Sequence, residues 1–370
     1  MLTIPEQFLF GLDISQSKLR LVQIRTGRKQ KIITALREVT LPAGVIVDGE
    51  IADPRQLTRH VAAIVRGRDL HDRLAGNGVI SVLPENKTFV KLVAVGGSSP
   101  AELEEALREE IPRQIPLPIA DLVYDWQLIG PAPPVPRDRP PAPAAANTPA
   151  ARSLVLVGAA ERRLVDAYRH VLGAAGLLTY ALEVEAAAIT RCLLPAAVTS
   201  PTGGQIIIDL GAFRTGLIIV RRGVIQFTVS LPISGRRVTD AVADTLKITS
   251  AEAEEAKLVC GLDDQRCQGA LRRVLYAMLD DLERKIDEAI SFYCENFEHG
   301  QPLEAIILSG GGANFLQIDR VLTERIRLPA RIADPLTNVA LRQPIAASTL
   351  QSYVTAIGLA LRGTQKDAVI

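Results

Sequence analysis

The sequence predicts an α/β fold in which two duplicated halves face a cleft and a small α+β domain is inserted between them. The first observation is a repeat: residues 10–27, FGLDISQSKLRLVQIRTG, and 206–223, IIIDLGAFRTGLIIVRRG, each place an aspartate after an apolar run and a glycine fourteen residues later. The second is length, because 370 residues with 48% hydrophobic content exceed one ordinary domain. A buried aspartate is costly unless a partner uses its charge, so Asp13 and Asp209 mark candidate sites.

Each copy of the repeat predicts three antiparallel strands followed by a helix, with the aspartate at the first turn. Two unrelated hairpins would also give this pattern, but the equal spacing favours duplication. The expected elements of the first copy are 8–14, 18–27, 31–42 and 53–68, and those of the second are 204–211, 214–223, 224–232 and 239–248.

The inserted segment alternates strands and helices. Ser99 followed by Pro100 and Glu102 is typical of a helix start, because the serine can cap the first turn and the acid suits its positive end. Residues 131–153 hold eight prolines and almost no large apolar side chain, which predicts a disordered surface loop. The other expected elements are two strands within 78–95, a helix over 99–118, strands at 121–130 and 153–159, and a helix over 161–176.

Composition excludes several classes of function. The net charge of +1 gives no general affinity for nucleic acid. The N-terminus lacks the pattern of an export signal, and no apolar run reaches the ~20 residues of a membrane span, so we expect a cytoplasmic protein, which could still dock on a membrane complex. The cysteines form no CxxC pair and are predicted to be isolated, reduced core thiols, and the histidines are too scattered for a metal site; these residues are Cys192, Cys260, Cys267, Cys294, His60, His71, His170 and His299.

A third candidate site lies in residues 303–326, LEAIILSGGGANFLQIDRVLTERI, which predict a strand, a glycine turn and a helix. Three successive glycines, Gly310, Gly311 and Gly312, let the backbone approach a ligand closely. Two acidic turns and a glycine turn suit a nucleotide with Mg²⁺, which needs only one or two carboxylates besides water. The sequence lacks the P-loop, the protein-kinase motifs, the GxSxG elbow and the Rossmann GxGxxG.

These motifs resemble those of the superfamily of actin, sugar kinases and heat-shock chaperone ATPases, whose duplicated domains are ribonuclease H-like. The aspartate turns are similar to its phosphate motifs, LSGGGANF to its adenosine motif, and EVEAAAIT and YVTAIGLALRG to its two connecting helices. Within it, the blocks GLDIS, LPAGVIVDGEIADP, ELEEALREEIPRQIPLPIADLVYDWQLIG, LEVEAAAITRCL and AIGLALRG resemble, in order, the PilM family of type IV pilus assembly proteins, which is related to FtsA.

The resemblance implies a division of the chain into four parts. The actin-like first half comprises 7–84, with 179–203 and 341–370 returning to it, and the inserted domain comprises 85–178. The core of the second half comprises 204–242 and 303–340, and a helical subdomain comprises 243–302.

The resemblance also implies roles for individual residues. Glu185 would stand near the metal and the attacking water, and Asp13 and Asp209 would hold Mg²⁺, with Asp209 also catalytic. Glu254 and Lys257 would flank the base and ribose, although a solvated helix face explains this pair equally well. The first phosphate turn would comprise Asp13, Ser15, Gln16 and Ser17, the second Asp209, Gly211, Ala212 and Thr215, and the adenosine turn Gly310, Gly311 and Gly312.

One residue departs from the family pattern. Close relatives carry glycine where this chain has Ser15. A serine adds a Cβ beside the phosphate and disfavours a positive φ by roughly 1 kcal/mol or more, although the hydroxyls of Ser15 and Ser17 could act as donors. We therefore expect ATP binding with slow or absent hydrolysis.

The function implied by the resemblance is an ATP-binding cytoplasmic scaffold that grips the N-terminal cytoplasmic peptide of PilN, an inner-membrane protein. A groove between the first half and the insert could accept that peptide as an added strand. Two alternatives remain from the sequence: a sugar-kinase-like phosphotransferase, for which we find no sugar site, and a filament-forming protein like FtsA.

Overall fold

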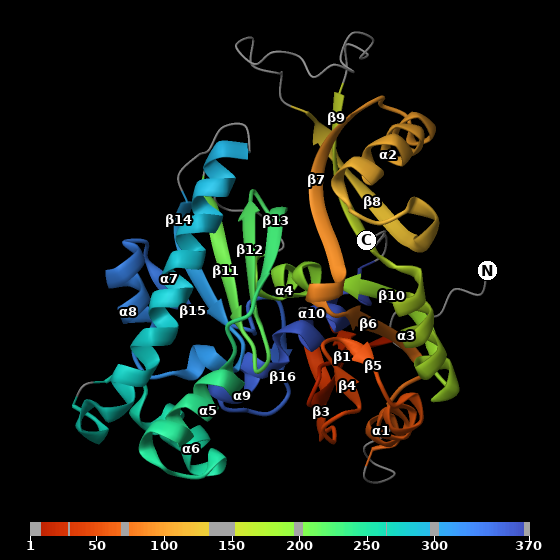
Figure 1. The fold of residues 1–370 in the computed structure, drawn as a ribbon. Coiled ribbons are helices and arrows are strands. Elements are labelled where there is room, and N and C mark those ends of the chain that lie inside the picture. The colour runs from red at the N-terminus through yellow and green to blue at the C-terminus, as the bar shows by residue number, and fades with distance from the viewer. Residues whose placement is uncertain are drawn as a thin grey trace.

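The computed structural model describes residues 9–28, 30–67, 74–132, 152–195, 203–263, 265–296 and 303–365. It contains one six-stranded and one eight-stranded sheet, which lie side by side with two helices between them (Figure 1). The predicted disordered loop falls mostly outside the described residues. Its expected ends belong to strands, because β8 runs to Pro131 and β9 begins at Arg152.

The six-stranded sheet has the order β10-β6-β1-β2-β3-β16. The predicted meander forms its centre, since β2 pairs antiparallel with β1 and β3, and β6 pairs parallel with β1. Helices α1 and α3 cover one face. The elements are β1 (Leu9–Ile14), β2 (Lys18–Thr26), β3 (Lys31–Thr40), the hairpin β4 (Ile46–Val47) and β5 (Glu50–Ile51), α1 (Pro54–Arg66), β6 (Gly78–Leu83), α3 (Arg162–Ala174), β10 (Leu178–Val184) and β16 (Ala340–Leu341).

The eight-stranded sheet has the order β15-β14-β11-β12-β13-β7-β9-β8. Its second-half part repeats the pattern of the first sheet: β12 pairs antiparallel with β11 and β13, and β14 pairs parallel with β11. The elements are β11 (Gly204–Leu210), β12 (Thr215–Arg221), β13 (Val224–Leu231), α5 (Gly235–Leu246), α6 (Ser250–Cys260), α7 (Ala270–Asn296), β14 (Leu303–Ser309), α8 (Ile318–Ile326), β15 (Ala330–Ile332) and α9 (Ala347–Leu350). This shared pairing pattern supports duplication.

The inserted segment extends the second sheet. Its strands β7 (Thr88–Gly96), β8 (Leu122–Pro131) and β9 (Arg152–Glu161) join β13 through one residue pair, Phe227 with Lys91. Helix α2 (Pro100–Gln114) covers one face of these strands and begins with the predicted cap, since Ser99 and Glu102 form a reciprocal capping box.

Helix α3 lies within the bounds expected for the inserted domain, yet its apolar side chains Leu164, Tyr168 and Leu172 pack in the core of the first half. The four-part division of the chain therefore stays a proposal, with α3 reassigned to the first half. Tyr168 also donates a hydrogen bond to the carbonyl oxygen of Gly49.

Helices α4 (Glu185–Leu193) and α10 (Val354–Arg362) lie between the two sheets (Figure 1). Strand residues point alternately to the two faces of a sheet, so Ile207 and Ile218 pack against these helices, whereas Ile206 and Leu217 pack against α5, α7 and α8. The helices cross closely at Gly358, where an added Cβ would lie 1.9 Å from the carbonyl oxygen of Ala188.

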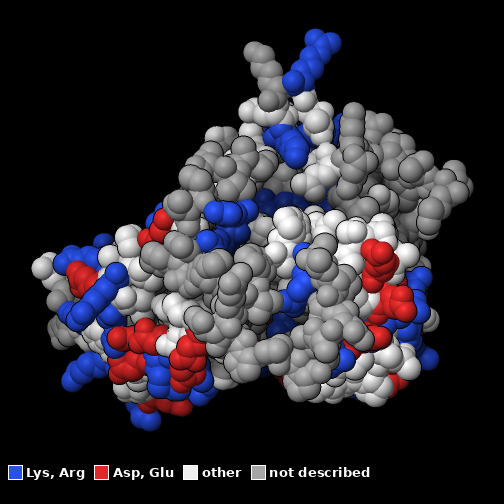
Figure 2. Space-filling model, turned by 90° about the horizontal axis from the view of Figure 1, so that it is seen from above, with Lys and Arg blue, Asp and Glu red and all other residues white. Residues whose placement is uncertain are grey.

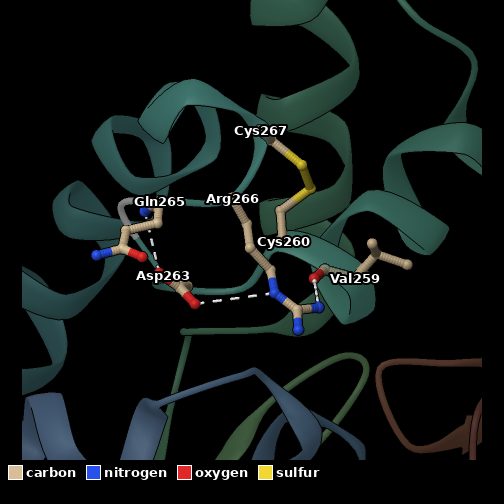
Figure 3. The surroundings of a disulfide bond; sticks show 6 residues. All are labelled: Val259, Cys260, Asp263, Gln265, Arg266 and Cys267. Atoms are coloured by element: carbon tan, nitrogen blue, oxygen red, sulfur yellow. Dashed lines mark hydrogen bonds and ion pairs between the residues drawn. A yellow bond between two sulfur atoms is a disulfide. The ribbon is translucent and has the colours of Figure 1, made fainter.

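The prediction of four isolated reduced thiols is wrong. Cys260 and Cys267 form a disulfide (Figure 3), while Cys192 is a buried free thiol and Cys294 an exposed one. The chain turns at Gly261, with φ of 52°, and this turn brings the two cysteines together although they are seven residues apart.

No helix within the described ranges is long and apolar enough to cross a bilayer. Viewed from above, Lys and Arg side chains lie both near the centre and at the edges of this face, and Asp and Glu side chains gather toward the edges (Figure 2). The two signs of charge are thus both present on this face, in keeping with the net charge of +1.

Candidate functional site

The first acidic turn connects β1 to β2. Asp13 is buried at the end of β1 and lies opposite Arg20, whose Nη1 is 3.5 Å from the Asp13 Oδ2. The turn closes through Ser15, because its N–H and its hydroxyl both donate to the carbonyl oxygen of Lys18, at 3.0 and 2.9 Å. The Ser17 carbonyl oxygen accepts a hydrogen bond from the N–H of Leu41. Gln16, which lies between Ser15 and Ser17 in the chain, is partly buried.

The second acidic turn has the same backbone geometry. The N–H of Gly211 donates to the carbonyl oxygen of Arg214 at 3.0 Å, as the N–H of Ser15 does to Lys18. The Asp209 Oδ1 accepts a hydrogen bond of 2.6 Å from the Ser309 hydroxyl on β14. The carbonyl oxygens of Gly211 and Ala212 hold the start of α5, because they accept from its first two N–H groups. The two turns are structurally equivalent.

Two expectations about these turns need correction. Ser15 does not have a positive φ, so the expected backbone strain is not present. Its hydroxyl is engaged within the turn, and the Thr215 hydroxyl donates to the carbonyl oxygen of Ile233 at 2.8 Å. Both hydroxyls therefore support the local fold, and phosphate would be met by backbone N–H groups.

Acidic side chains from both halves interact electrostatically. Burial raises the pKa of Asp13 to about 6, against the opposing charge of Arg20 and with a smaller contribution from Asp209. Burial also raises the pKa of Asp209, although the Ser309 hydrogen bond and Arg20 partly offset it. At the start of α4, burial and the charges of Glu85, Asp209 and Asp13 raise the pKa of Glu185 well above its usual range. Added positive charge at this place would be favourable.

The carboxylate that sequence reasoning missed is Glu85, in the turn between β6 and β7. Its Oε1 is buried and has no hydrogen-bond partner in the described part of the chain. A Cβ added at Gly216 would lie 2.7 Å from its Oε2, and Gly216 pairs with Asp209 in the β11–β12 register. Burial, followed by the charge of Asp209, raises the pKa of Glu85 to about 8. Its sequence signal is a carboxylate two residues after the buried strand β6, whereas Asp13 lies at the end of β1.

The glycine turn after β14 lies beside the second acidic turn. Gly310 has φ of 79°, and a Cβ there would lie 2.7 Å from the Leu210 carbonyl oxygen and 3.0 Å from the Asp209 Oδ1. A Cβ on Gly312 would meet the Leu210 side chain, whereas Gly311 faces open space. The structure thus brings Gly310 and Gly312 together with Leu210 and Asp209.

Glu254 and Lys257 lie one turn apart on α6. Lys257 is buried: its ammonium is 2.7 Å from Glu254, donates to the Thr239 hydroxyl and the Gly235 carbonyl oxygen, and stands 5.5 Å from the centroid of the Phe315 ring. Burial raises the pKa of Glu254, but hydrogen bonds from Lys257 and Thr239 outweigh it and lower that pKa. The solvated-face alternative does not hold for Lys257, which ties α6 to α5.

The donor set suits a metal held jointly with phosphate. Among the residues that the structure describes, no three His, Cys, Asp or Glu side chains converge tightly enough to hold an ion alone. Mg²⁺ commonly uses one or two carboxylates and completes its shell with water and phosphate oxygens. Asp13 and Asp209, with raised pKa values and each at a turn, fit that limited role.

A separate groove of ≈ 650 Å³ lies along α7 and α8. Its lining includes five carboxylates and two guanidinium groups, and Arg325 pairs there with Asp280 and Glu283. None of the predicted site residues lines it.

Comparison with known proteins decides the family. A sequence profile described as type IV pilus assembly protein PilM matches residues 11–364. The chain belongs to the PilM family. Among solved structures, a PilM-PilN type IV pilus biogenesis complex is similar with a TM-score of 0.78 and 25% identity, covering 98% of this chain and 100% of that chain. The actin-like fold and the pilus-assembly family are thus confirmed.

More distant relatives place the PilM fold in a wider group. The cell division protein FtsA of Pseudomonas aeruginosa is 26% identical over 189 residues, which cover 45% of this chain and 43% of FtsA, so the match spans less than half of that relative. MreB5 of Spiroplasma citri bound to ADP is similar with a TM-score of 0.53 and 15% identity, covering 95% of each chain. The ethanolamine utilization protein EutJ of Carboxydothermus hydrogenoformans is similar with a TM-score of 0.52 and 17% identity, covering 95% of this chain and 88% of EutJ. The similarities to MreB5 and EutJ show a shared fold.

Proposed function

We propose that this chain is an ATP-binding scaffold of the type IV pilus machinery that docks on the cytoplasmic N-terminal peptide of PilN at the inner membrane. The observation that carries the proposal is the likeness of nearly the whole chain to a PilM-PilN complex. The equivalent acidic turns and the adjoining glycine turn support the nucleotide part, and an actin-like structure with bound ADP supports it by fold.

ATP would lie between the two acidic turns, with Gly310–Gly312 against the adenosine. Asp13 and Asp209 would hold Mg²⁺, which would neutralise charge on the phosphates. Glu185, at the start of α4, is the candidate for orienting an attacking water. Because the hydroxyls of Ser15 and Thr215 are engaged within the fold, few side-chain donors remain for the phosphates. Binding with little steady-state turnover follows.

The peptide would bind where the two sheets expose edge strands. β10 ends the six-stranded sheet and β8 ends the eight-stranded one. Arg162 joins α3 to the start of β8 through hydrogen bonds to the carbonyl oxygens of Ala120 and Leu122. Exposed strand edges accept an extended peptide through backbone hydrogen bonds. Four of the exposed large apolar side chains lie on these two strands: Val123, Leu128, Leu178 and Tyr180.

Charged residues beside these edges connect to the central helices. Asp125 on β8 is raised in pKa by burial, and the Arg362 charge partly offsets this. Arg362 of α10 pairs with buried Glu183 of β10, which also accepts two hydrogen bonds from Arg191 of α4. Glu183 precedes Glu185 by two residues. A peptide at β10 could therefore bias the same helices that ATP contacts.

Titration calorimetry tests the proposal. Purified protein is titrated with ATP and Mg²⁺, and then with a synthetic PilN N-terminal peptide with and without ATP. We expect binding of both, with peptide and nucleotide each tightening the other by the same factor, typically ~5–150-fold for coupled sites. Peptide binding indifferent to ATP would remove the coupling, and an absence of ATP binding would refute the nucleotide site. Turnover of ~10 per second on an added alcohol or sugar would favour the kinase alternative.

The likeness to FtsA favours one further candidate function, polymerisation into filaments. Sedimentation with ATP and Mg²⁺ separates it from the scaffold function, because a filament pellets at high speed and a scaffold does not.

A further inference from the structure

The disulfide lies at the end of the helix that supports the candidate nucleotide site. Cys260 is the last residue of α6, and its Cα is 5.8 Å from that of Cys267, an ordinary separation for a disulfide. Cys260 is buried, whereas Cys267 is exposed and has φ of 50°, a left-handed conformation that disfavours a residue with a side chain. Between them, Arg266 pairs with Asp263 and donates to the Val259 carbonyl oxygen (Figure 3).

The same end of α6 packs on the segment that directly follows the glycine turn. Lys257 stands over the ring of Phe315 at 5.5 Å. The N–H of Leu262 donates to the carbonyl oxygen of Leu316 at 3.0 Å, and a Cβ at Gly261 would lie 2.5 Å from the Leu316 N. Residues 261–262 therefore fit against 315–316 with little space, so a shift of the α6 end must also move the chain that leaves the glycine turn.

We propose that Cys260–Cys267 is a reversible thiol–disulfide modification site that sets the affinity of the nucleotide site. The proposal rests on the proposed function, which places the chain in the reducing cytoplasm, where protein disulfides are usually transient, catalytic or redox-sensing. The reactant is a small thiol or its disulfide.

Because Cys267 is the exposed cysteine, its sulfur is the one that a small thiol attacks. A reductant thiolate attacks the Cys267 Sγ, the S–S bond breaks, and Cys260 leaves as a thiolate that takes a proton. A second reductant thiol then attacks the mixed disulfide, releasing the Cys267 thiol and the oxidised reductant, so two electrons pass from the two reductant thiols to the protein. A small oxidised disulfide such as oxidised glutathione reverses both steps.

Reduction is expected to weaken nucleotide binding. The disulfide links Cys260 to Cys267, and Cys267 has a left-handed backbone conformation. Without the disulfide the loop 260–267 gains conformations, and the end of α6 loses its fixed contact with Leu316. Nucleotide must then order the glycine turn as it binds, and the conformational entropy lost in doing so reduces the binding free energy. Affinity for ATP with Mg²⁺ should fall by about fivefold or more.

Two readouts on the full chain test this proposal. Calorimetry measures ATP affinity of the oxidised protein, the protein reduced with dithiothreitol, and the reduced protein reoxidised with oxidised glutathione. Hydrogen exchange measures protection of residues 250–263 and 303–316 in the same states. Cys267→Ser, at an exposed position, should match the reduced protein and ignore reductant, whereas the control Cys294→Ser, also exposed, should respond as the natural chain does.

The outcomes separate this proposal from the proposed function. Weaker ATP binding and faster exchange at both segments on reduction, reversed by oxidation, support it. Equal affinity and equal exchange in both states, or failure of Cys260 and Cys267 to pair with oxidised glutathione present, overturn it. If the oxidised protein binds no ATP, the proposed function fails; faster exchange of 303–316 on reduction would then still support the link between thiols and glycine turn, and unchanged exchange would overturn it.

Discussion

The hydroxyl of Ser15 donates a hydrogen bond of 2.9 Å to the carbonyl oxygen of Lys18. This bond closes the first acidic turn at the position where Gly211 closes the second through its N–H alone. The serine that departs from the family pattern is thus part of the turn's hydrogen bonding.

Replacing Ser15 tests that contribution. Ser15→Gly removes the hydrogen bond that the hydroxyl donates to the Lys18 carbonyl oxygen and the one that it accepts from the Lys18 N–H, and it adds backbone freedom. We therefore expect the free energy of unfolding to fall by about 1–2 kcal/mol. Urea denaturation measures it. Ser15→Ala, which removes only the two hydrogen bonds of the hydroxyl, should show the smaller loss, and equal stability of all three proteins would show that the hydroxyl contributes nothing.

Removing each aspartate should affect ATP binding unequally. In Asp13→Ala, the Arg20 Nη1 loses the carboxylate 3.5 Å away and can meet phosphate, although the Arg20 Nε stays paired with Glu38 at 2.9 Å; this offsets part of the loss. Asp209→Ala leaves no such cation, because Asp209 is bonded to Ser309. We expect about tenfold weaker Mg-ATP binding for Asp209→Ala and a few-fold loss for Asp13→Ala, measured by calorimetry, with the exposed Asp244→Ala as control. Equal losses would contradict the role given to Arg20.

Glu85 should make stability depend on pH. Its pKa is raised from 4.5 to about 8 in the folded chain, so the folded state holds this proton more tightly than the unfolded state. Stability from this group is complete below about pH 4.5 and is lost as the pH rises toward 8. Glu85→Gln should therefore gain stability relative to the natural chain between pH 5 and pH 8, measured by urea denaturation.

The exposed Glu105→Gln is the matched control for Glu85→Gln and should show no such trend. A stability difference for Glu85→Gln that stays constant from pH 5 to pH 8 would refute the raised pKa.

The crossing of α4 and α10 should tolerate no side chain at Gly358. Gly358→Ala would place a Cβ 1.9 Å from the Ala188 carbonyl oxygen, so the helices must separate. We expect a loss of about 3 kcal/mol in unfolding free energy. Gly173→Ala is the control, since it lies in α3 with open space around it and should gain up to about 1 kcal/mol. Similar effects at both positions would disprove the close crossing.

Tyr180 on the edge strand β10 tests the peptide site. This residue is 53% exposed, and its ring offers an aromatic anchor. Tyr180→Ser should weaken PilN-peptide binding about tenfold, measured by calorimetry, and leave ATP affinity in the absence of peptide unchanged. Ile332→Ser is the control. Ile332 is an exposed apolar residue on β15, the edge of the eight-stranded sheet that lies opposite β8, and this variant should bind peptide normally. A loss in both variants would mean that the peptide does not bind specifically at β10.

Several features follow from local sequence because their physics is local. The repeated apolar strands with Asp13 and Asp209 at their first turns, the cap formed by Ser99 and Glu102, and the glycine turn at Gly310 depend on residues a few positions apart. Residue preference and spacing describe such features well. The family relation was visible for the same reason, since short blocks carry the motifs.

Other features depend on residues that only the folded chain brings together. Glu85 meets Gly216, 131 positions later in the chain, and the apolar face of α3 packs with α1 in the core of the first half. Cys260 pairs with Cys267 where Gly261 turns the chain against Leu316. The sequence by itself determined the duplicated strands, the acidic and glycine turns and the PilM family. The tertiary structure decided which carboxylates share one site and which cysteines pair, because burial and charge interaction depend on distances in space that sequence separation does not determine.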